Sequence, residues 1–168
     1  IKTAAKLRHV NIVRVFDVSE NKGRHFFAMQ YVRGKSLGKI TLRRPLDNLL
    51  AAKYLEQVAR AINYSHRSGI LHRDLKPANI LIDDDTDRAL VADFGLAKVL
   101  ERGHIITAIG ETHGTPSFMA PEQARDAVEA TEQSDIYSLG ATLYAILSGK
   151  PPFFAARSSE TLRQLIEE

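Results

Sequence analysis

One long helical repeat constrains the fold of this chain more than any other feature. Apolar residues recur at helical spacing from Asp47, a favourable N-cap, to Ser68, and Gly69 supplies the C-terminal stop. This is the longest helix that the sequence predicts.

Strand-like segments precede and follow this helix. Two runs rich in Val, Ile and Phe predict strands at 12–18 and 25–31, and Asn21-Lys22-Gly23 between them is typical of a hairpin turn. Short apolar runs at 80–82 and 89–92 flank an acidic turn and predict a second, smaller hairpin. That turn is not an EF-hand calcium loop, because it lacks the Gly at the sixth and the Glu at the twelfth position.

Two further helices are predicted near the end of the chain. One opens at Ser134, a good N-cap, and runs to Ser148 with almost no polar face, so we expect it to be buried all round. Gly149 ends it. A final amphipathic helix starts near Ser158 and continues to the last residue.

Composition excludes several classes of protein. The 168 residues allow one domain or a piece of a larger one, and the absence of cysteine excludes disulfides and Cys-zinc sites. A net charge of +3 is too small to predict a nucleic-acid partner. No apolar run is long enough to span a membrane and no signal pattern is visible, so we expect a cytoplasmic segment, with any membrane anchor lying outside it.

Residues with the chemistry of phosphoryl transfer are concentrated in one region. That reaction needs a carboxylate to accept the proton of the attacking hydroxyl, a cation to meet the growing charge, and oxygens to hold magnesium between phosphates. The set is supplied, in chain order, by Asp74, Lys76, Asn79 and Asp93. Because the hairpin after Asn79 returns the chain, these residues can converge on one site.

The strings His72 to Asn79, Asp93-Phe94-Gly95 and Met119 to Gln123 together resemble the eukaryotic-type Ser/Thr protein kinases of bacteria. The resemblance implies that Asp74 is the catalytic-loop aspartate and that Asp93 and Asn79 are the first and second magnesium ligands. ATP and Mg²⁺ are the implied phosphate donor and metal.

The resemblance also indicates the phosphate acceptor. Lys76, two residues after the catalytic aspartate, and Thr115 in Gly114-Thr115 resemble the Ser/Thr branch of the family rather than the Tyr branch. A protein substrate with a Ser or Thr hydroxyl is therefore expected, with Lys76 meeting the transferred phosphate.

An adenine site is implied by the residues after the second predicted strand. Met29 resembles the family's gatekeeper, the Gln30 carbonyl would accept from the adenine amino group, and the Val32 amide would donate to the ring. Leu81 would form the apolar floor under the base.

Other residues resemble those that align the family's active site. Asp135 resembles the residue that anchors the catalytic-loop backbone. Phe94, His72 and Val15 would stack into the internal column seen in active members.

A regulatory site is expected around the activation loop. Arg73 and Lys98 suggest a cationic pocket that is satisfied when the loop gains a phosphate. Thr107 sits where related loops carry that phosphate, and Thr112 is the second candidate. A kinase–kinase dimer could carry out this phosphorylation.

The resemblance implies an α+β fold that is part of a kinase domain. Residues 1–34 would be a remnant of the small lobe and hinge, with a helix end and two strands, and residues 35–168 a mainly helical large lobe truncated in the helix after Pro151-Pro152. The chain holds no Gly-rich loop, strand Lys or helix Glu of the family. We therefore expect these 168 residues alone to bind ATP weakly and to transfer phosphate negligibly.

Two alternatives remain at this point. One is a pseudokinase that uses the fold as a scaffold or binding module, which the intact Asp74, Asn79 and Asp93 argue against. The other is a small-molecule phosphotransferase, which would not be expected to carry the strings Gly114-Thr115-Pro116 and Ala120-Pro121-Glu122.

Overall fold

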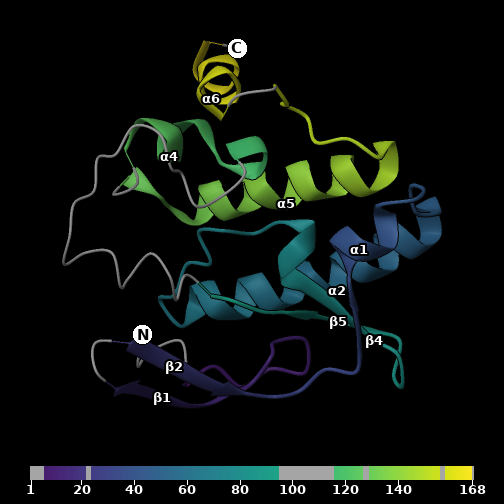
Figure 1. Cartoon of the computed structure of the whole chain (residues 1–168), viewed down its shortest axis with the longest axis vertical. Coiled ribbons are helices and arrows are strands. Elements are labelled where there is room, and N and C mark those ends of the chain that lie inside the picture. Colours follow the sequence, from purple (N-terminus) through teal and green to yellow (C-terminus); the bar gives the residue numbers. More distant parts are fainter. Residues whose placement is uncertain (1–5, 22–23, 95–115, 127–128, 156–157, 168) are drawn as a thin grey trace.

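Figure 1 shows a computed structural model of the chain, which describes residues 6–21, 24–94, 116–126, 129–155 and 158–167. Its elements, in chain order, are the strands β1 (Val15–Asn21), β2 (Arg24–Met29) and β3 (Gly34–Ser36), the helices α1 (Leu37–Thr41), α2 (Asn48–Arg67) and η2 (Pro77–Asn79), the strands β4 (Ile80–Asp83) and β5 (Arg88–Val91), and the helices η4 (Pro116–Phe118), α4 (Pro121–Arg125), α5 (Glu132–Ser148) and α6 (Ser158–Glu167). The α+β expectation is confirmed. The helix end predicted at the start of the 1–34 segment falls mostly outside the described residues.

The longest predicted helix is confirmed as α2. Asp47 Oδ1 accepts the N–H groups of Leu49 and Leu50 at 2.9 and 3.4 Å, which satisfies two donors at the helix start. At the other end Gly69 adopts a φ of 70°, in the left-handed region that glycine tolerates best.

The strands form two small antiparallel sheets. β1 pairs with β2, with an irregular register between Val15 and Asp17. β3, β4 and β5 form the other sheet in that order, with Lys35 opposite Ile82 and Leu81 opposite Leu90. The second predicted hairpin is therefore confirmed.

The first predicted strand is wrong in its extent. The sequence predicts one strand over 12–18, whereas β1 begins at Val15 and Ile12 instead forms a parallel bridge with Val91 of β5. Val13 N–H donates to the Val91 carbonyl at 2.9 Å, and Val91 N–H donates to the Asn11 carbonyl at 2.8 Å. The residues before β1 thus satisfy the open edge of the sheet that carries the candidate site.

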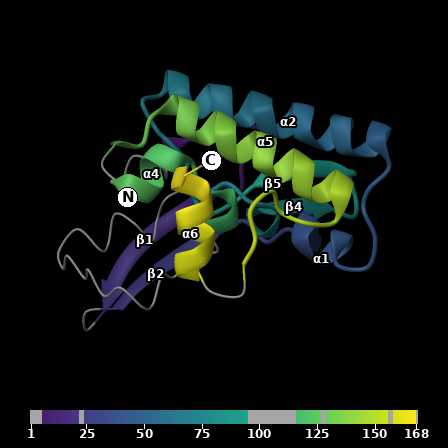
Figure 2. The ribbon, with the colours of Figure 1, turned by 90° about the horizontal axis from the view of Figure 1, so that it is seen from above.

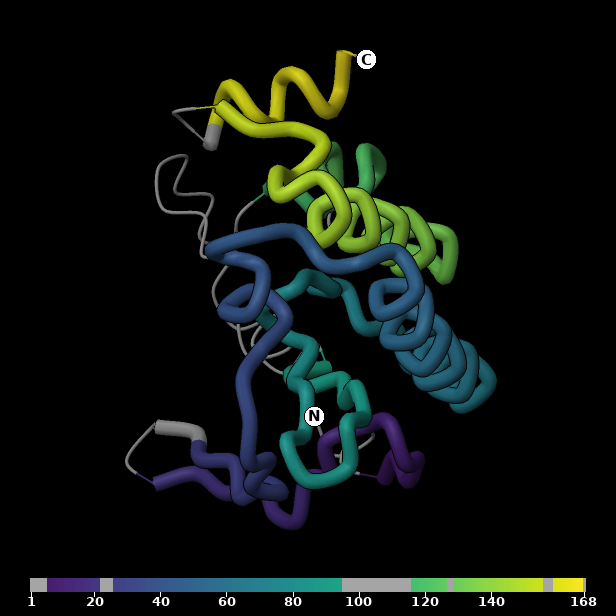
Figure 3. Tube along the Cα trace, turned by 90° about the vertical axis from the view of Figure 1, so that its right-hand side faces the viewer, coloured from purple at the N-terminus to yellow at the C-terminus, as the bar shows by residue number. Residues whose placement is uncertain are grey.

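The core lies between α2, α5 and the β3–β4–β5 sheet. Figures 1 and 2 show α2 and α5 lying side by side, with β4 and β5 below them in Figure 1. The buried side chains of these elements include Leu55, Val58, Ile62, Ile80, Val91 and Ile146, and Leu37 of α1 belongs to the same cluster. In Figure 3 the β1–β2 hairpin and α6 lie at opposite ends of the molecule.

The prediction for α5 needs two corrections. The helix begins at Glu132 after the N-cap Thr131, and Ser134 lies inside it, because the Ser134 hydroxyl accepts Thr131 N–H at 3.0 Å from within the first turn. The helix is also not buried all round, since Ile136 is 52% exposed and Tyr144 53%. Only one side of α5 packs on α2 and the loop before η2, so its apolar residues on the other side contact solvent.

The final helix is confirmed as α6, which begins at Ser158 and buries Thr161 and Leu165. α6 lies against α4, so the end of the described chain is part of the packed structure. Across the described residues, no helix combines the length and the hydropathy that a transmembrane span requires.

Candidate active site

The structure brings Asp74, Lys76 and Asn79 together. Lys76 Nζ lies 3.2 and 3.0 Å from the two carboxylate oxygens of Asp74. Asn79 Nδ2 donates to the Asp74 carbonyl at 2.8 Å and to Asp74 Oδ2 at 3.1 Å. The carboxylate of Asp74 is thus oriented by two donors, and its side chain remains 39% exposed, so a substrate can reach it.

Asp93 lies two residues after β5, and β4, the strand that pairs with β5, begins directly after Asn79. Ala92 N–H donates to the Asn79 carbonyl at 2.9 Å, which places Asp93 one residue beyond this contact. Asn79 uses its Nδ2 toward Asp74, and its Oδ1 accepts no hydrogen bond from the described residues. An exposed carboxylate and an amide oxygen are ligands that Mg²⁺ accepts alongside phosphate oxygens.

These residues fit a shared metal better than a closed protein site. The described residues contain no group of three or more His, Cys, Asp or Glu that could hold a metal by themselves. Mg²⁺ usually keeps waters and takes one or two protein ligands together with substrate phosphates. The donor set of Asn79 and Asp93 therefore suits a magnesium ion that arrives with a nucleotide.

His72 connects the catalytic loop to the segment before Asp93. Asp74 N–H donates to His72 Nδ1 at 3.2 Å, and His72 Nε2 lies 3.0 Å from the Ala92 carbonyl. Burial lowers the pKa of His72 below its ordinary value, although Asp135 and the Ala92 carbonyl act in the opposite direction. A neutral ring with its proton on Nε2 satisfies both contacts.

The predicted ring contact between His72 and Phe94 is confirmed, with ring centroids 4.7 Å apart and planes tilted by 49°. Both side chains are buried. The position of Val15 in the same column stays a prediction.

Asp135 anchors the backbone of the catalytic loop, as predicted. Its carboxylate is 1% exposed and accepts the N–H groups of His72 and Arg73, each at 2.8 Å. His66 of α2, whose side chain is 8% exposed, places Nε2 2.8 Å from Asp135 Oδ2. Three donors therefore compensate a carboxylate that is removed from water.

The backbone of the candidate site is strained at two positions. Arg73 has a φ of 66° and Asp93 a φ of 60°, both in the left-handed region that costs a residue with a side chain about 1 kcal/mol or more. Such conformations persist only where surrounding contacts enforce them, and here Asp135 supplies one of those contacts.

The predicted adenine residues lie beside an apolar cluster. Val32 and Leu81 pack against the buried residues Val13, Leu90 and Ala92. Met29, at the end of β2, is 41% exposed. Within the described part of the chain, neither the Gln30 carbonyl nor the Val32 N–H has a hydrogen-bond partner, so both are available to a ligand.

Four predicted site residues lie outside the described residues, namely Lys98, Thr107, Thr112 and Thr115. Arg73 is described, and its main chain contacts α5 through Asp135. Its predicted regulatory role stays a prediction.

Sequence reasoning missed several residues that hold the site. Gln57 Oε1 accepts from Ala89 N–H at 2.8 Å and from Asn11 Nδ2 at 3.2 Å, which joins α2, β5 and the segment before β1. Gln123 Nε2 lies 3.3 Å from the Arg73 carbonyl. His66 of α2 contacts Asp135, 69 positions later in the chain. These contacts span 32 to 69 positions, and no local pattern predicts them.

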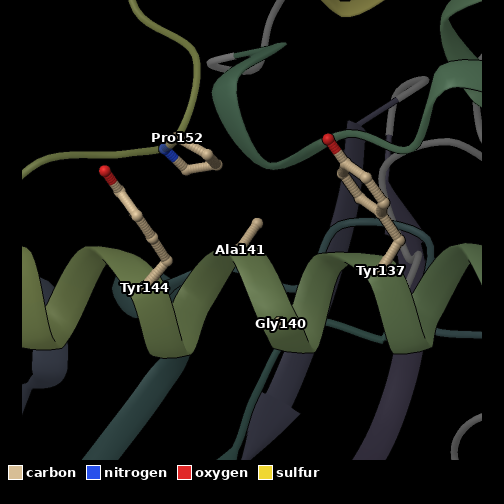
Figure 4. A pocket seen from close by; sticks show the side chains of 5 residues that line it. All are labelled: Tyr137, Gly140, Ala141, Tyr144 and Pro152. Atoms are coloured by element: carbon tan, nitrogen blue, oxygen red, sulfur yellow. The ribbon is translucent and has the colours of Figure 1, made fainter. Parts of the chain in front are cut away.

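A shallow apolar pocket on α5 is separate from this site. Figure 4 shows its lining, formed by Tyr137, Gly140, Ala141, Tyr144 and Pro152. None of these residues is a predicted catalytic or nucleotide-binding residue.

The comparisons with known proteins agree in their result. The family profile described as protein kinase domain matches residues 1–168. The DNA damage-responsive serine/threonine-protein kinase RqkA of Deinococcus radiodurans is 40% identical over 176 aligned positions, which cover 100% of this chain and 25% of RqkA. The serine/threonine-protein kinase PknB of Mycobacterium tuberculosis is 40% identical over 159 positions, covering 90% of this chain and 25% of PknB.

A solved structure agrees with this result at the level of the fold. The crystal structure of Rad53 1–466 in complex with AMP-PNP matches with a TM-score of 0.78 and 30% identity, over 99% of this chain and 41% of that one. The chain spans about a quarter of the length of the curated relatives named above. With its fold, its catalytic-loop geometry and a match along its whole length, the chain belongs to the protein kinase family.

Proposed function

We propose that this chain is the catalytic part of a Ser/Thr protein kinase, which transfers the γ-phosphate of ATP to Ser or Thr hydroxyls of a protein. The observation that carries the proposal is the contact of Lys76 Nζ and Asn79 Nδ2 with the Asp74 carboxylate. The likeness to Ser/Thr kinases of bacteria supports the same acceptor chemistry.

Each residue of the cluster has a distinct task in this proposal. Asp74 accepts the hydroxyl proton as the acceptor oxygen bonds to the γ-phosphorus, while the bond from that phosphorus to the bridging oxygen breaks and ADP leaves. Lys76 moves from its contact with Asp74 toward the transferred phosphate and stabilises its charge. Thr115 helps to orient the acceptor hydroxyl.

Asn79 and Asp93 hold Mg²⁺ in this proposal. When bound at these two side chains, the ion would supply positive charge that offsets the charge of the phosphates. Met29 lines the adenine pocket, the Gln30 carbonyl and the Val32 N–H read the adenine edge, and Leu81 supports its face.

A phosphotransfer assay tests the proposal. The longest natural chain that contains these residues is incubated with ATP, Mg²⁺ and an acceptor protein, and mass spectrometry locates the phosphate. Phosphoserine or phosphothreonine is expected, and Asp74→Asn is expected to lower the rate by about 10²-fold to 10⁴-fold. Asp84→Asn is the matched control, because Asp84 is exposed in the turn after β4 and lies outside the cluster. Equal rates for Asp74→Asn and the control would refute the assignment.

We further propose that phosphorylation of Thr107, or of Thr112 in second place, by another copy of the kinase activates the protein through Arg73 and Lys98. Thr107→Ala is expected to leave a protein of low activity that lacks this phosphate. A fully active Thr107→Ala enzyme would contradict the regulatory proposal and leave the catalytic one intact.

A further inference from the structure

The side chain of Gln123 joins α4 to the catalytic loop. Gln123 is 6% exposed, and its Oε1 accepts the main-chain N–H of Ala120 at 3.4 Å. Its Nε2 donates to the Arg73 carbonyl at 3.3 Å, 50 positions earlier in the chain. The orientation of the amide follows from its partners, because an N–H needs an acceptor and a carbonyl needs a donor.

The Arg73 carbonyl belongs to the peptide group that leads into Asp74. The other side of this peptide group is Asp74 N–H, which donates to His72 Nδ1 at 3.2 Å. Gln123 and His72 therefore hold opposite sides of one peptide plane. The preceding peptide is held separately, through Arg73 N–H and Asp135.

Arg73, which precedes this peptide group, has a φ of 66° in the left-handed region, and such a conformation persists only where surrounding contacts enforce it. Rotation of this peptide plane changes ψ of Arg73 and φ of Asp74, and it would redirect the Asp74 carboxylate that Lys76 and Asn79 contact. Gln123 Nε2 donates to the Arg73 carbonyl and so opposes this rotation.

We infer that Gln123 is a positioning residue that fixes the Arg73–Asp74 peptide and so aims the Asp74 carboxylate. The inference rests on the proposed function for its catalytic consequence, whereas its structural consequence can be measured without activity. Through this contact, the start of α4 and the orientation of Asp74 depend on each other.

If Gln123 only capped α4, its substitution would have a different effect. Gln123 is the third residue of α4, where Glu and Gln both cap by accepting the N-cap N–H. Gln123→Glu keeps that acceptor for Ala120 N–H and replaces the donor to Arg73 with an oxygen. This variant therefore separates capping from positioning.

Amide hydrogen exchange measured residue by residue is the decisive experiment. In Gln123→Glu we expect the Asp74 amide to exchange at least about tenfold faster than in the unmodified protein, because the loop opens locally more often. The exchange rates of the α2 amides should not change. In the phosphotransfer assay kcat is expected to fall about tenfold or more with a small change in the KM for ATP, because small displacements of reacting groups are costly. Unchanged Asp74 exchange in Gln123→Glu would overturn the inference.

Two further variants complete the test. Gln164→Glu, an exposed residue of α6, is the matched control and is expected to leave both readouts unchanged. Gln123→Met removes both the acceptor and the donor with little change in size. It replaces Gln123→Glu in the test if that variant does not fold, and it is expected to speed the exchange of the Asp74 amide. If the unmodified protein transfers no phosphate but Asp74 exchange still responds, the proposed function fails and the positioning contact stands.

Discussion

Asp135 of α5 accepts the main-chain N–H of His72 at 2.8 Å across 63 positions of sequence. The same carboxylate accepts Arg73 N–H at 2.8 Å and contacts His66 of α2. One buried side chain thus connects the two long helices and fixes the backbone that presents Asp74. Stability and activity should therefore respond together to changes at Asp135.

Replacing Asp135 by Asn tests this connection. The amide keeps one acceptor but turns an NH₂ group toward a main-chain N–H, so one buried donor loses its partner. We expect the free energy of unfolding to fall by about 3 kcal/mol and phosphotransfer to fall with it. Urea unfolding and the kinase assay measure both, with Asp84→Asn as control. Normal stability in Asp135→Asn would show that the carboxylate is not needed.

His66 should contribute through the same network. His66→Leu removes the donor 2.8 Å from Asp135 Oδ2 and leaves a buried carboxylate oxygen less compensated. We expect a loss of about 1–3 kcal/mol in the free energy of unfolding. His66→Gln can place an amide N–H near the Nε2 position and should recover part of it. Equal stability of both variants would indicate that packing, rather than the hydrogen bond, explains the role of His66.

What the sequence predicted correctly depends on local signals. The start of α2 is encoded by Asp47, whose side chain caps residues two and three positions later. The cluster of Asp74, Lys76 and Asn79 lies within six consecutive residues, so one motif predicts it. The hairpin that carries the chain from Asn79 to Asp93 is equally local.

What the sequence could not predict depends on distant partners. Ile12 and Val13 look like the start of the strand predicted over 12–18, but they pair instead with Val91 of β5, nearly 80 positions later. The sequence predicts that all sides of α5 are buried, because the apolar residues around this helix do not indicate which side lacks a packing partner. The sequence around Gln123 does not predict its role, because its side chain contacts the carbonyl of Arg73, 50 residues away.

Tyr54 should make the fold sensitive to alkaline pH. Burial, followed by the hydrogen bond to Asp87 at 2.5 Å and the charge of that carboxylate, raises the pKa of Tyr54 from 10.0 to about 12. The neutral phenol is favoured in the folded state, so its contribution is complete below pH 10.0 and is lost as the pH rises toward 12.

Spectrophotometric titration of the tyrosines checks this prediction. One tyrosine should ionise near pH 12, and its signal should disappear in Tyr54→Phe. Tyr54→Phe should also lose about 1 kcal/mol at neutral pH through the missing hydrogen bond. Its stability should then decline less steeply than that of the unmodified protein above pH 10.0. An unchanged alkaline profile in Tyr54→Phe would contradict the assignment.

Gly34 and Gly140 should respond in opposite directions to the same change. A Cβ on Gly34 would lie 1.9 Å from the Ile82 carbonyl oxygen, so Gly34→Ala must push β3 away from β4. We expect a loss of about 1–3 kcal/mol in the free energy of unfolding and weaker nucleotide binding, because Val32 lies just before this strand. A Cβ on Gly140, inside α5, meets no atom within 4 Å, so Gly140→Ala should gain about 0.5–1 kcal/mol. Urea unfolding of both variants measures the difference, and a Gly34→Ala protein as stable as Gly140→Ala would show that β3 does not pair tightly with β4.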